Sequence, residues 1–195
     1  MDLILATRNK DKVREIKQIL GRIPFRILSL ADFPEISEIK ETGRTFNENA
    51  IKKARLVAKK FRSLALADDS GLEVDYLKGA PGIRSARFAG PGAGSYELCS
   101  KLLRLMKTVS KKKRKARFVC DAAIATPAGK VFVVEGTCSG SIAFEMRGKN
   151  GFGYDPIFIP SGYKKTFAEL SPNTKNRISH RAKAFKKAKK VLLAI

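Results

Sequence analysis

The stretch Leu64-Ala65-Leu66-Ala67-Asp68-Asp69-Ser70-Gly71 runs from a short apolar segment into two adjacent carboxylates. Consecutive apolar residues bounded by turn formers are typical of a buried strand, so we expect a strand over 64–67 and another over 72–75 after a turn. Open sheets present ligand crevices at the carboxyl ends of their strands. Two interpretations of residues 68–71 follow: a capped turn, or an acidic site whose internal repulsion a cation relieves.

The segments before this stretch alternate between strand and helix patterns. Residues 2–6 and 25–30 are apolar runs typical of buried strands. Between them, Asn9 precedes apolar residues at helical spacing, and Gly21 closes that helix. Thr45-Phe46-Asn47-Glu48 has the form of a capping box, and the apolar positions after it predict an amphipathic helix of about four turns that reaches Phe61.

The segments after it begin with a long loop. Residues 79–94 hold five glycines and two prolines, which predicts an ordered loop or a lid. Leu98 to Met106 has helical spacing, and residues 116–124 alternate as in a strand. The turn signal Pro127-Ala128-Gly129 then indicates a hairpin. Further strands are predicted over 131–137, 141–145 and 157–159.

The chain closes with a glycine-rich break at 148–156 and a helical region. Ser171-Pro172 supplies an N-cap and a proline at the first helical position. Apolar residues from Ile178 to Leu192 predict a terminal helix. Because both hairpin and crossover connections occur, the fold class is α/β or α+β with a mixed sheet. With no repeat and no linker, residues 1–195 are expected to form one domain, with two lobes about the glycine-rich loop.

Composition bounds the partners. Forty Lys and Arg against 18 Asp and Glu give 195 residues a formal charge of +22, which favours polyanions such as nucleotides or nucleic acid. The 44% apolar content argues against a disordered or fibrous chain. No apolar stretch is long enough to span a membrane and no secretory signal opens the chain, so we expect a cytoplasmic protein without a membrane partner. The three cysteines suggest neither disulfides nor a zinc site.

Two lysine clusters carry much of this charge. The run Lys111-Lys112-Lys113-Arg114-Lys115 lies between a helix pattern and a strand pattern, and a second cluster over 183–190 lies on the last helix. Each is interpreted either as a solvated loop or helix face, or as a surface for a polyanion.

The segment Ala6-Thr7-Arg8-Asn9-Lys10-Asp11-Lys12 joins the first strand to the first helix. The free amides and positive dipole end of that helix would favour a phosphate. Thr7 and Asn9 add hydrogen-bonding groups and Lys12 adds an ammonium, as in a P-loop that lacks its glycines. The alternative is an Asn9 N-cap beside surface lysines.

Two further constellations complete the candidate site. Glu41, with the carboxylates at 68 and 69, could hold Mg²⁺, which takes one or two carboxylates plus phosphate oxygens. Phe152-Gly153-Tyr154-Asp155 offers aromatic rings and a polar edge to a nucleobase, or else a turn with core-facing rings. Lys175, His180 and Arg181 would diverge on a straight helix, so their joint use requires a break near Ser179.

With these motifs in order, the sequence resembles the inosine triphosphate pyrophosphatase family, nearly end to end. The motifs are Thr7-x-Asn9-x-x-Lys12, Glu41-Thr42-Gly43-x-Thr45-Phe46-x-Glu48-Asn49-Ala50, Ala67-Asp68-Asp69-Ser70-Gly71-Leu72, Gly79-Ala80-Pro81-Gly82-Ile83-x-Ser85-Ala86-Arg87, Gly151-Phe152-Gly153-Tyr154-Asp155-Pro156 and Ser179-His180-Arg181.

The resemblance implies hydrolysis of the non-standard purine nucleoside triphosphates ITP, dITP and XTP to the monophosphate and pyrophosphate, with Mg²⁺ required. It implies an elongated α/β fold, with a mixed sheet flanked by helices and two lobes around an active-site cleft, and a homodimer. It assigns metal binding to Glu41 and Asp69, and the role of general base to Asp69. The substrate-binding residues that it implies are Thr7, Arg8, Asn9, Lys10, Asp11, Lys12, Ser70, Phe152, Gly153, Tyr154, Asp155, Lys175, His180 and Arg181.

Three alternatives stay open. Many relatives have glycine where this chain has Arg8, so that side chain either contacts phosphate or points outward. The chain could instead be a basic nucleic-acid-binding protein, whose binding would weaken steeply with salt. It could also be a related nucleotide pyrophosphatase with another base preference. A pocket built for a 6-oxo purine leaves polar groups unpaired when adenine enters, which disfavours adenine.

Overall fold

The computed structural model describes residues 1–37 and 39–195. Its strands are β1 (Asp2–Leu5), β2 (Arg26–Ser29), β3 (Leu64–Val74), β4 (Lys115–Ala125), β5 (Val131–Ile142) and β6 (Phe158–Pro160). Its α-helices are α1 (Lys10–Leu20), α2 (Phe46–Phe61), α3 (Ser95–Leu105), α4 (Pro172–Ile178) and α5 (His180–Leu192). Within these residues, no helix is both long and apolar enough to cross a membrane.

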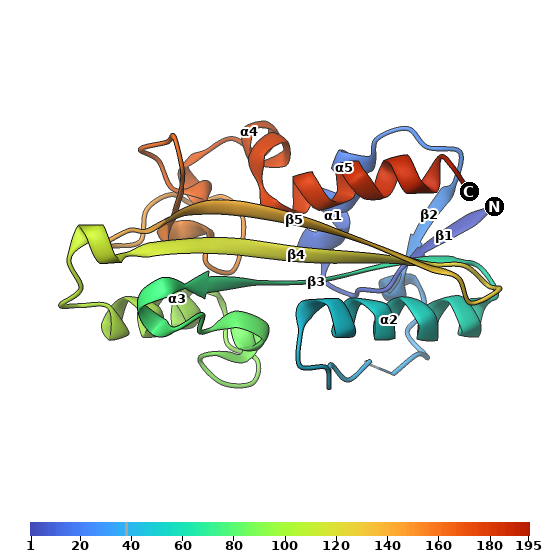
Figure 1. Ribbon diagram of the computed structural model, residues 1–195, viewed down its shortest axis with the longest axis horizontal. Coiled ribbons are helices and arrows are strands. Elements are labelled where there is room, and N and C mark those ends of the chain that lie inside the picture. Colours follow the sequence, from blue (N-terminus) through green and yellow to red (C-terminus); the bar gives the residue numbers. More distant parts are fainter. Residues whose placement is uncertain (38) are drawn as a thin grey trace. The chain divides into compact units, whose positions relative to one another are not determined.

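The strands form one six-stranded mixed sheet in the order β2-β1-β3-β4-β5-β6, so the α/β class expected from the sequence is confirmed (Figure 1). β1 pairs in parallel with β2 and with β3, whereas β5 and β6 are antiparallel. The chain divides into two compact units, and we describe each by itself. The first unit comprises 1–69, 120–136 and 181–195, and the second comprises 70–119 and 137–180.

The first unit has a helix layer on each face of its strands. One face buries Leu3, Leu66 and Ile124 against α1 and α5. The opposite face buries Ile4 and Ala65 against α2. Strand side chains alternate between faces, so strands covered on both sides are apolar throughout. This explains why residues 3–6 and 64–67 are uninterrupted apolar runs.

The second unit has its own apolar core. Residues of β3 and β4 pack there with one face of α3, and with Phe158 and Phe167 from the later segments. The rings of Phe118 and Phe158 meet edge to face, with centroids 4.7 Å apart. This core supports the loop over 151–155, which packs Tyr154 into it.

Two predicted strand breaks are wrong. Residues 64–74 form one strand, β3, with no turn at Asp68-Asp69-Ser70-Gly71. The two buried carboxylates stay in regular strand geometry because cationic and amide groups pair with them. Residues 131–142 likewise form one strand, β5, in which Gly140 lets β6 approach closely: a Cβ there would lie 2.3 Å from the Ile159 carbonyl oxygen.

The structure also bears on the predicted helices and on the predicted loop over 79–94. The helix to Phe61 begins on a Thr45 cap, as its capping pattern predicted. α4 ends at Ile178 and α5 begins at His180, so the chain has at Ser179 the break that joint use of Lys175, His180 and Arg181 would require. The predicted loop over 79–94 contains a 3₁₀ helix, Gly82–Arg87.

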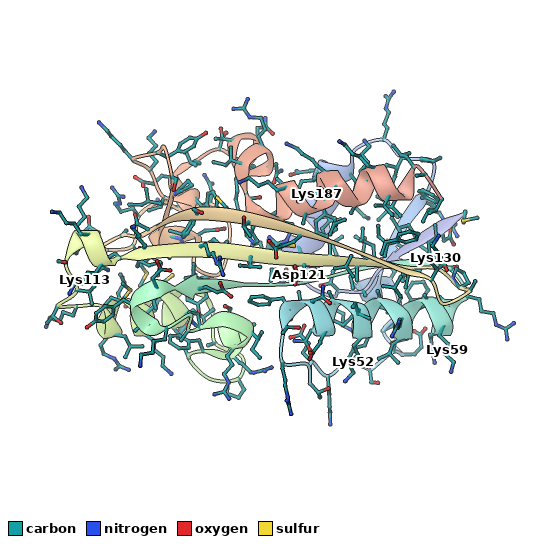
Figure 2. The ribbon with its side chains drawn as sticks, viewed as in Figure 1. Lys52, Lys59, Lys113, Asp121, Lys130 and Lys187 are labelled. Atoms are coloured by element: carbon teal, nitrogen blue, oxygen red, sulfur yellow. The ribbon has the colours of Figure 1, made fainter. Side chains whose placement is uncertain are left out.

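The basic run over 111–115 is only partly solvated. Lys111, Lys112 and Lys113 form an exposed 3₁₀ turn, but Arg114 is 2% exposed. The remaining lysines are spread over several elements: Figure 2 labels Lys52 and Lys59 on α2 and Lys187 on α5. The net charge is therefore distributed rather than confined to one run.

Candidate active site

The turn that opens α1 is organised by its own side chains. Asn9 caps the helix by accepting a hydrogen bond from the Lys12 backbone N–H at 3.0 Å. The Thr7 hydroxyl accepts one from the Asn9 N–H at 3.2 Å. The Asn9 N-cap is therefore confirmed. Phosphate binding by the first-turn amides, which a helix N-terminus favours, stays a prediction.

Two other residues of the predicted phosphate loop, Arg8 and Asp11, bind protein groups outside that turn. The Arg8 guanidinium donates to the carbonyl oxygens of Phe33 and Ile36, the former at 2.9 Å, and so holds the segment after β2. Lys10 is exposed, and Asp11 pairs with Arg14 at 2.7 Å on the helix surface. These contacts account for Arg8 and Asp11 without a ligand.

Asp68 is the centre of a buried ionic network. Its Oδ2 atom lies 3.0 Å from Lys12 Nζ and 3.6 Å from Arg181 Nε. Arg181 Nη1 in turn donates to Glu15 at 2.7 Å, so α1, β3 and α5 share one network. Burial opposes ionisation of Asp68, but Lys12, Arg181 and Lys53 outweigh it and hold the pKa of this carboxyl well below its usual range. Asp68 thus fixes the position of the Lys12 ammonium.

Asp69, the next residue, points into a different environment. Its Oδ2 atom accepts a hydrogen bond from Asn49 Nδ2 at 2.9 Å, and its Oδ1 atom lies 3.8 Å from Lys53 Nζ. Burial, with the nearby charge of Glu41, raises the pKa of Asp69 to about 6, although Lys53 and Asn49 oppose the shift. Asp69 is therefore the more basic of the two carboxylates.

The residues that the sequence suggested for Mg²⁺ lie together. Lys53 Nζ is 2.5 Å from Glu41 Oε1 as well as near Asp69, so a single cation already bridges the two carboxylates. Mg²⁺ binds one or two carboxylates and takes its remaining ligands from phosphate and water. Residues 1–37 and 39–195 contain no group of three or more His, Cys, Asp or Glu able to hold a metal.

A buried ion pair holds the predicted nucleoside loop. Lys175 Nζ lies 2.5 Å from Asp155 Oδ2, which also accepts from the Phe152 N–H at 2.8 Å. The same ammonium lies 4.9 Å from the centroid of the Phe152 ring. Gly151 has a φ of +76°, and a Cβ there would meet the Asp155 carboxylate at 2.0 Å. Only glycine fits this turn.

The helix α3 holds the same loop from the other side. The Gly153 N–H donates to Ser95 Oγ at 2.7 Å, and Cys99 Sγ donates to the Gly153 carbonyl at 3.3 Å. Tyr154 is buried and donates its hydroxyl to the Ser85 carbonyl at 2.9 Å. Tyr154 is thus a core residue, while Phe152 is half-buried.

The remaining predicted residues are His180 and Arg181, which open α5, and Ser70 in β3. The His180 ring stacks on Phe118 with centroids 4.6 Å apart. Arg181, predicted with the nucleoside group, lies instead in the network of Asp68. Ser70 is half-buried and follows Asp69 in β3.

Sequence reasoning assigned no role to five residues that organise these groups. Asn49 and Lys53 on α2, Glu15 on α1, and Ser95 and Cys99 on α3 all contact predicted site residues. A signal existed for the first two, because they fall among the apolar positions that bury one face of α2. Ser95 and Cys99 meet the loop only through tertiary structure.

The comparisons agree along almost the whole chain. The model of the Ham1 family matches residues 3–191. A dITP/XTP pyrophosphatase of Desulforamulus reducens is 51% identical over 192 residues, covering 98% of this chain and 96% of the relative. A dITP/XTP pyrophosphatase of Bacillus anthracis is 49% identical over 187 residues, covering 95% and 93%. The structure of a HAM1 protein from Coxiella burnetii superposes with a TM-score of 0.90 at 40% identity, covering 100% of both chains.

Proposed function

The chain belongs to the Ham1 family, and from that premise we propose that it is a dITP/XTP pyrophosphatase. It hydrolyses non-standard purine nucleoside triphosphates to the monophosphate and pyrophosphate. The observation that carries the proposal is the pair of adjacent carboxylates with opposite environments. Asp68 holds the Lys12 ammonium, whereas Asp69, whose pKa is raised to about 6, lies near the carboxylate of Glu41.

We assign the triphosphate to the opening turn of α1. Lys12 and the first-turn amides stabilise the charge that develops on the leaving pyrophosphate. Asp68 restrains the Lys12 ammonium through a 3.0 Å contact, so this charge is oriented before substrate binds. Such preorganisation lowers the cost of stabilising the transition state.

We assign the role of general base to Asp69. Its Oδ1 atom accepts the proton of the attacking water, while the hydrogen bond from Asn49 fixes Oδ2. Glu41 and Asp69 would hold Mg²⁺, which supplies charge neutralisation to the phosphate oxygens when bound. The Lys53 ammonium, now between these carboxylates, must share or yield that position.

We assign binding of the nucleobase to the loop over 152–155, together with Lys175 and His180. The Phe152 ring supplies a stacking face, and the buried Asp155–Lys175 pair fixes the loop. A 6-oxo purine offers an acceptor where adenine offers a donor, so adenine leaves buried groups unpaired. Guanine is itself a 6-oxo purine, so its exclusion depends on its 2-amino group, which hypoxanthine lacks and xanthine replaces by an oxo group.

The deciding experiment is pyrophosphate release from dITP, XTP, ITP, ATP and GTP with Mg²⁺, with orthophosphate followed separately. We expect pyrophosphate from the first three and little from the others. The Asp69→Asn variant should fold normally and lose turnover by at least about a hundredfold, the usual contribution of a general base. Orthophosphate release, or full activity of the variant, would refute the assignment.

We also propose that the protein is a cytoplasmic homodimer, as the resemblance implies. Sedimentation equilibrium measures the oligomeric state directly. A mass of one chain, 21.5 kDa, at micromolar concentration would contradict the dimer.

A further inference from the structure

The second unit has a hollow of about 430 Å³. It is lined by Lys111, Ser141, Ile142, Ala143, Phe144, Glu145, Arg147, Ile159, Tyr163 and Lys164. None of these residues belongs to the candidate active site. The hollow combines two exposed rings with three cations, a combination that the proposed reaction does not use.

The Phe144 ring is the most exposed of these apolar groups, at 62%. One face of the ring contacts the protein, because the guanidinium of the buried Arg114 lies 4.4 Å from the ring centroid. Arg114 is itself fixed by donating to the carbonyl oxygens of Met106, Ile142 and Ala143 at 2.7, 2.8 and 2.7 Å. The ring is thus seated on an immobile cation while most of its surface faces solvent.

The charge around the hollow is positive. Lys111, Arg147 and Lys164 outnumber Glu145, the single carboxylate of the lining. Arg147 lies 3.7 Å from Glu169, which leaves the exposed Lys111 and Lys164 as the strongest attraction for an anion. The basic turn continues from Lys111 through Lys113, labelled in Figure 2, and Lys165 follows Lys164.

We propose that this hollow binds single-stranded nucleic acid, with one base stacked on Phe144 and the neighbouring phosphates on Lys111 and Lys164. Exposed rings beside cations that track a backbone are the elements of single-strand recognition. A duplex keeps its base faces stacked inside and cannot offer one to Phe144. Further lysines follow two of the lining cations in the sequence, Lys112 and Lys113 after Lys111 and Lys165 after Lys164, which suits a strand better than a single nucleotide.

The test is fluorescence anisotropy of a labelled oligothymidylate of about 12 nucleotides, a length typical of single-strand sites. The full-length protein is titrated at several salt concentrations. Phe144→Leu keeps an apolar side chain over Arg114 but removes the ring. Lys111→Ala/Lys164→Ala removes two charges, and Lys59→Ala/Lys60→Ala removes the same charge from α2 as a matched control.

Phe144→Leu should weaken binding by about fivefold to a hundredfold, the loss of one base–aromatic stack. The lining double variant should weaken it by at least about tenfold and flatten its salt dependence, and the α2 control by less than about threefold. Melting temperature and ITP hydrolysis should stay unchanged in all three, which separates this site from the proposed reaction.

Three results would overturn the proposal. Equal losses in the two lysine variants would reduce the binding to adhesion by net charge. Competition by a nucleoside monophosphate at concentrations near the affinity of the strand would make the hollow a mononucleotide site. Dissociation of an oligomer by Phe144→Leu, seen by sedimentation, would make this face an interface between copies of the chain.

Discussion

Asp68 and Asp69 are neighbours in β3, yet their side chains have opposite electrostatics. Strand geometry sends adjacent side chains to opposite faces, so one meets Lys12 and Arg181 while the other meets Asn49 and Lys53. Burial disfavours both carboxylates. At Asp68 the effect of the nearby cations is larger and the pKa falls, whereas at Asp69 the effect of burial is larger and the pKa rises. The strand itself therefore separates a structural anion from a proton acceptor.

This difference predicts a pH-dependent stability in metal-free protein. The Asp69 pKa of about 6 lies above its ordinary 3.8, so the folded state binds this proton more tightly and Asp69 costs stability as pH rises from about 4 to about 6. Asp69→Asn removes that cost. The unfolding free energy of the variant relative to wild type should rise by on the order of 2 kcal/mol over this range. Urea titrations with a chelator at each pH measure it, and a constant difference would contradict the raised pKa.

The buried pair Arg181–Glu15 predicts a large effect from a small change. Glu15→Gln leaves the Arg181 charge buried with less compensation, and should lower the unfolding free energy by on the order of 3 kcal/mol. Asp11→Asn, which breaks the exposed pair with Arg14, should cost less than about 1 kcal/mol. Urea denaturation of both variants compares a buried with an exposed ion pair, and equal losses would refute the argument.

At the scale of elements, α3 is the support of the nucleoside loop. Two side chains one turn apart, Ser95 and Cys99, contact the two polar groups of Gly153. Ser95→Ala removes one hydrogen bond, worth about 0.5–1.5 kcal/mol. We expect KM for dITP to rise by about twofold to tenfold with kcat less affected, because the loop binds the base and does no chemistry. Steady-state kinetics test this, with Tyr96→Ala on the exposed face of α3 as control. An unchanged KM would show that Gly153 needs no such support.

The sequence predicted an element correctly where interactions between residues close in the sequence determine it. The Thr45 cap and the apolar runs of β1 and β3 depend on neighbouring residues. The turn expected at residues 68–71 failed for the opposite reason. Polar residues continue β3 because Lys12 and Asn49, distant in sequence, pair with them.

The candidate site divides in the same way. Motif spacing singled out Glu41 and Asp69, which the Lys53 ammonium bridges, and separately the loop over 152–155, in which Asp155 accepts from the Phe152 N–H. Spacing gave no indication that Arg8 would hold carbonyl oxygens after β2, or that Arg114 would be buried under Phe144. Both are long cations, which sequence patterns place on the surface by default. Each is buried or tied down by backbone carbonyls that no pattern specifies.

At the scale of the whole molecule, the net charge of +22 affects the rate at which the protein and its substrate associate, rather than the fold. A nucleoside triphosphate with bound Mg²⁺ is still an anion, so the field of the protein accelerates its approach. Salt screens that field over a Debye length of about 10 Å at 0.1 M. We therefore expect kcat/KM to fall by about tenfold between 20 and 200 mM potassium acetate, while kcat stays constant.

Steady-state kinetics at fixed, saturating free Mg²⁺ check this, with sucrose as an uncharged control that should leave kcat/KM unchanged. A parallel fall of kcat would place the effect of salt on bound substrate instead, at Lys12 and the α1 amides. The two cases have different structural origins. Long-range attraction depends on the summed charge of lysines distributed over the protein, whereas stabilisation of bound phosphate depends on the single ammonium that Asp68 holds in place. Only the distributed charge should respond strongly to salt, because Lys12 is largely shielded from solvent, with 18% of its side chain exposed.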